Sequence, residues 1–85
     1  MLELGGFPVA EEDALQLVVL LYRAAYVRTA DRVASALTRG RREVCLTIDD
    51  ERAILDVLED TPKSLAPLRG VVAADYLCRI RDELA

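Results

Sequence analysis

The sequence lacks histidine and tryptophan entirely, and its only lysine is Lys63. Without histidine, the commonest general acid–base chemistry at neutral pH and the Glu-x-x-His motif of di-iron helix bundles are both excluded. The two cysteines, Cys45 and Cys78, form no CxxC pattern. We therefore expect reduced, buried cysteines rather than a disulfide framework or a zinc site.

Nucleophiles and phosphate-binding loops are equally scarce. Ser35 and Ser64 are the only serines, and both read as helix or cap positions. Gly5-Gly6 precedes Phe7-Pro8 with no strand before it, so it is not a phosphate loop. One cluster of carboxylates on a predicted helix is typical of a solvated face: Asp56, Glu59 and Asp60. The sequence predicts no catalytic, cofactor or metal site, and we expect a protein that is not an enzyme.

Long hydrophobic runs are also missing. The longest nearly unbroken apolar segment, Leu17 to Tyr22, is far too short to span a bilayer, and no basic region precedes an apolar run at the start. We therefore expect a cytoplasmic protein without membrane contact. Hydrophobic residues nevertheless make up 53% of the 85 residues. A single domain this small has a limited core, so the surplus predicts association with a partner.

The N-terminal half predicts an irregular arm and then one long helix. Residues 1–10 contain Gly5-Gly6 and Pro8 and read as the arm. From Glu11 to Arg39 there is neither proline nor glycine, and Gly40 follows as a natural C-terminal cap. This segment predicts a continuous helix of roughly 43 Å. Modest helix formers at Thr29–Asp31 mark the place where it could break.

The two halves of this predicted helix differ in character. The first half is apolar all around its axis, so it requires burial on every side. We expect a homodimer, or a groove on a larger partner, to cover an apolar band of four residues: Leu17, Val18, Leu20 and Leu21. The second half has one polar face, formed by Arg28, Arg32, Ser35 and Arg39.

An extended segment at 43–48 leads into a second helix. Val44, Leu46 and Ile48 alternate with polar or small residues, which predicts a short strand with these three facing inward. Thr47 followed by Asp50 resembles a capping box, so we expect the second helix over about residues 49–60. Thr61-Pro62 then ends it.

The third predicted helix begins at Ser64, tolerates Pro67 in its first turn and runs to about Glu83. Gly70 within it predicts a close helix crossing or a bend. One apolar stripe recurs every four residues: Leu68, Val72, Tyr76, Ile80 and Leu84. The expected fold is all-α: a single three-helix domain over residues 11–85 whose long first helix packs against an antiparallel pair formed by the other two.

Charge is distributed in blocks. Residues 1–22 carry a net −4, residues 23–42 carry +5, residues 43–67 carry −5 and the remainder is neutral. One interpretation is internal pairing of the arginines with Asp49, Asp56 and Glu59. The other is a surface for an anionic partner, made by Arg28, Arg32, Arg39, Arg41 and Arg42.

Residues 42–77 resemble a ribbon-helix-helix repressor in their order of strand, helix, short loop and helix. The resemblance implies a dimer whose paired strands enter the major groove, with Glu43, Cys45 and Thr47 facing DNA. A glutamate there opposes DNA binding, and the loop "DTPKS" lacks the glycine usual in that family. The stretch "ERAILDVLEDTPKSLAPLRG" also resembles the first two helices of a winged helix-turn-helix, in which case residues 71–85 supply the recognition helix.

The combination of "LTIDDERAIL" and "LAPLRGVV" is similar to small helical proteins of high-GC Gram-positive bacteria, which implies a bacterial origin and no particular activity. The overall net charge of −4 disfavours a phosphate backbone as the main partner. The sequence therefore predicts a non-enzymatic protein–protein interaction or regulatory module, as a homodimer or a small subunit of a larger complex. A DNA-binding regulator is the alternative.

Overall fold

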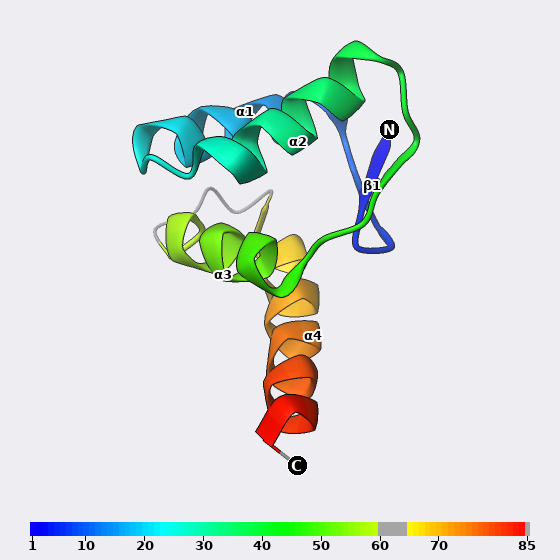
Figure 1. The fold of residues 1–85 in the computed structure, drawn as a ribbon. Helices are drawn as coiled ribbons and strands as arrows, with labels where there is room; N and C mark the ends of the chain where they lie inside the picture. The colour runs from blue at the N-terminus through cyan, green and yellow to red at the C-terminus, as the bar shows by residue number, and fades with distance from the viewer. Residues whose placement is uncertain (60–64, 85) are drawn as a thin grey trace.

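The computed structural model describes residues 1–59 and 65–84 of the chain. Within these residues it contains four helices and a three-stranded mixed sheet (Figure 1). The elements are, in chain order, β1 Leu2–Leu4, β2 Phe7–Val9, α1 Glu11–Arg23, α2 Val27–Thr38, β3 Glu43–Val44, α3 Ile48–Val57 and α4 Ala66–Leu84. The all-α, three-helix prediction is therefore wrong, although helices dominate the fold.

The N-terminal segment is a β-hairpin and not an irregular arm. Gly5 and Gly6 have φ values of 58° and 87°, the left-handed backbone that a two-residue hairpin turn requires. The turn pairs Leu2 with Val9 in antiparallel register, and both side chains are buried. Pro8 is tolerated because β2 is an edge strand in the order β2-β1-β3.

The extended segment predicted at 43–48 is a strand only at its start. β3 pairs in parallel with β1, with Val44 opposite Leu4. The predicted alternation is confirmed further along, because Val44 and Leu46 are buried while Cys45 is exposed. Ile48 is already the first residue of α3.

The predicted long helix is wrong, because α1 and α2 form a helical hairpin. Ala25 takes a left-handed conformation with φ of 66°. The N–H of Tyr26 donates to the carbonyl of Leu21 at 2.9 Å, and that of Ala25 donates to Tyr22 at 3.1 Å. These bonds form a Schellman motif that ends α1, with Ala25 four residues before Thr29, where the sequence marks a possible break. The fold-back lets the apolar sides of both helices share one core.

Two predicted helix boundaries are confirmed. Gly40, with φ of 66°, follows α2 as expected, and the N–H of Arg41 donates to Ala36 at 2.9 Å in a second Schellman motif. Thr47 caps α3 in a reciprocal capping box: its hydroxyl accepts from the N–H of Asp50 at 3.2 Å, and Asp50 accepts from the N–H of Thr47 at 3.0 Å.

Asp50 also joins α3 to α2. It is 4% exposed, and it accepts a 2.7 Å hydrogen bond from the hydroxyl of Thr29. Its other oxygen lies 3.0 Å from Nη1 of Arg32. The buried carboxylate is therefore fully partnered, which fixes the orientation of the two helices.

The helices do not pack as predicted. α1 and α2 lie side by side on one side of α3, and α4 runs across α3 and away from the other helices rather than antiparallel to α3 (Figure 1). Leucine, isoleucine, valine and alanine side chains from all four helices and the sheet fill one core. α3 ends at Val57, about three residues before the end expected for the second helix. Thr61-Pro62 and the cap at Ser64 lie outside the described residues.

α4 belongs to the core only near its N-terminal end. Leu68 and Val72 are buried, as is Leu65 just before the helix. Pro67 lies in the first turn, as predicted. A Cβ added at Gly70 would meet nothing within 4 Å, so this glycine marks no close helix crossing.

Candidate interaction surface

The C-terminal half of α4 projects from the body of the molecule (Figure 1). Several of its apolar side chains are exposed. Leu77 is 66% exposed and Leu84 is 83% exposed. Ala73, one turn before Leu77, and Ile80, between the two leucines, are partly exposed. Spacings of four, three and four residues place these four on one side of the helix. We call Ala73, Leu77, Ile80 and Leu84 the α4 stripe. Tyr76, which is partly exposed, flanks it.

A different side of α4 is attached to the body by Arg79. Its Nη1 donates a 2.8 Å hydrogen bond to the carbonyl of Leu46 in the segment before α3. Its Nε lies 3.1 Å from Asp75, one turn back along α4, and 3.4 Å from Glu51 on α3. The guanidinium thus joins three segments, and these contacts hold α4 with its stripe facing solvent.

Glu51 is an unusual partner because it is almost completely buried, with 2% exposure. Its Oε1 accepts no hydrogen bond from the described part of the chain, although Nε of Arg79 lies nearby. Burial raises the pKa of Glu51 to about 7, helped by the hydrogen bond to Asp75 and by the negative charges of Asp75 and Asp50. The charge of Arg79 acts in the opposite direction. We call Glu51, Asp75 and Arg79 the Glu51 cluster.

The apolar band predicted as an interface lies mostly inside the chain. Leu17 and Leu21 are 0% exposed and Val18 is 7% exposed, while Leu20 is partly buried against the same core. The first helix is not buried on all sides, however. A second exposed stripe runs along its outer side: Leu15, Val19 and Tyr22. A surface interface on α1 would therefore use different residues from those predicted.

The five predicted anion-binding arginines do not share one site. Arg32, Arg39 and Arg41 line a concavity of about 400 Å³ between α2 and β3, together with Ser35 and Glu43. Arg28 lines another hollow, near the start of α2. Within residues 1–59 and 65–84, only Arg32 of the five has an ion-pair partner, and that partner is Asp50. The predicted pairing with Asp49, Asp56 or Glu59 is not found there.

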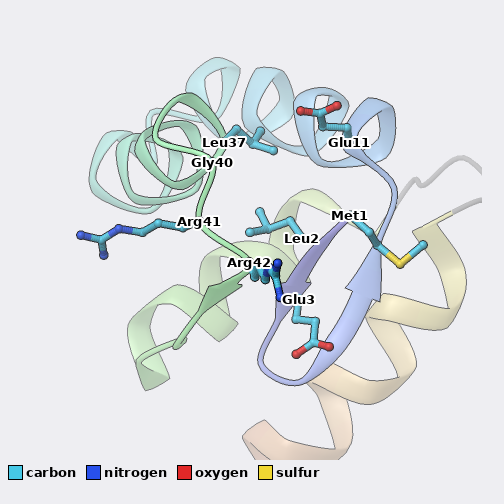
Figure 2. Close-up of a pocket in the computed structure, with 8 residues that line it drawn as sticks. All are labelled: Met1, Leu2, Glu3, Glu11, Leu37, Gly40, Arg41 and Arg42. Carbon is cyan, nitrogen blue, oxygen red and sulfur yellow. The ribbon is translucent and has the colours of Figure 1, made fainter.

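A third hollow, of about 340 Å³, opens where the N-terminal strand meets the end of α2 (Figure 2). Arg41 points away from it, and Arg42 lies next to Glu3, whose N–H donates to the Arg42 carbonyl at 2.8 Å. Glu11 also lines the hollow. Because both charge signs line it, this hollow does not select an anion.

The cysteines differ from their prediction, since Cys45 and Cys78 are both free and exposed. In the part of the chain that the structure describes, no group of three or more cysteine or acidic side chains could hold a metal ion. No described helix is long and apolar enough to cross a membrane.

The arrangements expected for DNA binding also differ from the structure. β3 pairs with β1 of its own chain, so it already has the partner that the ribbon resemblance supplied from a second chain. Residues 66–84 form one continuous helix, so the described part of the predicted recognition helix is not a separate element.

The α4 stripe differs from the apolar stripe predicted from the sequence, which followed a strict four-residue repeat and shares only Ile80 and Leu84 with it. Only Leu68 and Val72 are fully buried, whereas Leu84 is open to solvent. Leu77 lay outside that repeat, although its spacing of three to Ile80 and seven to Leu84 is the signal that could have identified the stripe. Comparison of the chain with family models, with curated proteins and with solved structures gave no match.

Proposed function

We propose that this protein is a non-enzymatic interaction module that self-associates through the α4 stripe. The observation that carries the proposal is the projecting half of α4, where two leucines are at least 66% exposed. A contiguous apolar surface on a helix that leaves the body is typical of an interaction site. A spacing of four, three and four residues is that of a coiled-coil seam.

The flanks of the stripe are compatible with a second copy in antiparallel orientation. With Leu77 opposite Ile80 of the second copy, Arg81 lies near the partner's Ala74 and Glu83 lies near the partner's Tyr76. No like charges then meet across the seam. A parallel pair brings the two bodies to the same end of the helices, whereas the antiparallel pair places them at opposite ends. The arrangement is an isologous two-fold contact.

The seam is short. Residues 73–84 span roughly 17 Å of helix, which buries less surface than a standard interface of about 1,600 Å². We therefore expect weak self-association, with a dissociation constant in the micromolar range or above, so that the dimer fraction rises with protein concentration.

The first test is the solution mass, measured by light scattering after size exclusion at about 10 µM and about 500 µM and at two salt concentrations. We expect the mass to rise toward that of a dimer, with little effect of salt because the seam is apolar. Leu77→Glu should give a monomer at every concentration and retain its helical circular dichroism, because this side chain makes no part of the core.

Leu15→Glu is the matched control, since Leu15 is 55% exposed on the stripe of α1. It should leave the mass unchanged. A wild-type chain that stays monomeric at the highest concentration contradicts the proposal. Dissociation by Leu15→Glu and not by Leu77→Glu moves the interface to α1.

A further inference from the structure

The Glu51 cluster lies where the projecting helix leaves the body. Glu51 comes from α3, and Asp75 and Arg79 come from α4. The charged groups that act on the buried carboxyl are these two and Asp50, its neighbour on α3, which is itself paired with Arg32. The segment before α3 contributes the carbonyl of Leu46, which accepts from Arg79.

These contacts control the outer half of α4. Beyond Val72 no described residue of the helix is fully buried. Among the described residues, the polar contacts that join residues 73–84 to the rest of the chain all involve Asp75 or Arg79. Whatever weakens the Glu51 cluster therefore frees the segment that bears the α4 stripe.

We propose that the protonation state of Glu51 determines how firmly the outer half of α4 is held against α3, so that the cluster regulates the orientation of the α4 stripe. This inference extends the proposed function, because the stripe is the surface assigned there to self-association.

The two states of the cluster differ by one proton. With Glu51 neutral, its carboxyl O–H donates to the Asp75 carboxylate, which is also paired with Arg79. Loss of the proton to solvent removes this donor and leaves two carboxylates facing each other, one of them buried with an unpartnered oxygen. A single guanidinium then serves both, and the buried charge is relieved if α4 moves and admits water. The pKa of about 7 for Glu51 places this change in the neutral range.

The chain carries its own reporter positions. Cys45 precedes α3, Cys78 lies on α4 beside Arg79, both are exposed, and they are the only two cysteines. Spin labels on both allow the distance between them to be measured by pulsed electron paramagnetic resonance. The measurement is made in the Leu77→Glu background, so that dimer formation cannot contribute to the distances.

At about pH 6 we expect a narrow distance distribution, and at about pH 8.5 a broader one, with a midpoint near the pKa of Glu51. Glu51→Gln should keep the distribution narrow at both pH values. Arg79→Gln should broaden it at both, because the attachment of α4 to Leu46 is lost. Glu59→Gln, an exposed change of the same kind, should follow the parent chain.

A parent chain with the same distribution at both pH values overturns the inference, as does a Glu51→Gln chain that still responds to pH. This test and the test of self-association can fail independently. If the wild-type chain is monomeric by light scattering but its distance distribution responds to pH, the inference about Glu51 stands and the proposed self-association is wrong. If the chain forms a dimer but the distribution does not respond to pH, the proposed self-association stands and the inference about Glu51 is wrong.

Discussion

Glu51 makes the free energy of unfolding depend on pH in an unusual direction. Its pKa is about 7 in the folded chain against an ordinary value of 4.5. Below pH 4.5 the Glu51 carboxyl is protonated in both the folded and the unfolded chain, and its contribution to the free energy of unfolding is fully present. As the pH rises toward 7 the unfolded chain releases this proton while the folded chain retains it, so stability falls and then levels off above 7.

We therefore expect Glu51→Gln to stabilise the protein at pH 8, by on the order of 2 kcal/mol, because the amide stays neutral where a buried carboxylate would not. The gain over the wild type should vanish near pH 4. Urea denaturation at a series of pH values measures the difference. Glu59→Gln, on the surface, should change stability little at any pH, and a Glu51→Gln chain less stable than wild type at pH 8 would refute the assignment.

Single residues also explain why the break between α1 and α2 lies at Ala25 and not at Thr29–Asp31. Ala25 adopts a left-handed backbone that costs roughly 1–2 kcal/mol for an alanine, and the sequence offers no glycine or asparagine there. The cost is offset by tertiary contacts, since the fold-back allows Tyr22 to donate to Asp31 and Tyr26 to donate to Asp56 at 2.6 Å. Such contacts are invisible to local propensity. By contrast, the Thr47 cap was predictable because both of its partners lie within four residues.

At the scale of elements, two helix-associated glycines give opposite expectations. Gly70 lies inside α4 with open space around its Cα, so Gly70→Ala should raise the free energy of unfolding by about 0.5–1 kcal/mol. Gly40 has φ of 66° after α2, so Gly40→Ala should lower it by about 1 kcal/mol, although it too has open space. Thermal or urea unfolding of the two variants makes the comparison. If both changes act in the same direction, backbone conformation is not what distinguishes the sites.

The strands could be predicted from the sequence less well than the helices, for identifiable reasons. Leu2, Leu4 and Val9 alternate around Gly5-Gly6, which is a hairpin signal, but Pro8 within the second strand argued against it. The parallel partner of β1 lies about 40 residues away in sequence, and no local pattern could supply it. The burial alternation at Val44 and Leu46 was predicted correctly, because it depends only on neighbouring residues.

For the whole molecule, the distribution of charge is unfavourable for tight binding to nucleic acid. The chain carries a net −4, and the five arginines predicted to bind an anion are spread over three hollows and not gathered in one site. We expect no measurable binding to duplex DNA by fluorescence anisotropy, even at low salt. Binding that weakens steeply with salt, with a slope that is reduced by Arg41→Ala combined with Arg42→Ala, would instead support a DNA-binding function.

The candidate site was predictable only in part at this scale. The surplus of apolar residues led to the expectation of association, which stays a prediction, and the sequence could not show which of these residues the single chain would bury. The fold-back of α1 on α2 buries Leu17 and Leu21, and the projection of α4 leaves Leu77 and Leu84 outside. Both outcomes depend on how the helices pack. Leu17 and Leu77 are both leucines in helices, so local sequence alone does not show that one is buried and the other exposed.

The parallel pairing of β1 with β3 constrains the order in which the protein folds. β1 is the middle strand of the sheet, yet Glu3 pairs with Glu43 only after the intervening segment is available. The β1–β2 turn and the α1–α2 hairpin involve short loops and can form early, whereas closing the sheet requires a long-range encounter. During synthesis the first strand thus leaves the ribosome well before its second neighbour. Until β3 emerges, Leu2 and Leu4 lie at the open edge of an incomplete sheet, and pairing with another nascent chain competes with the native register.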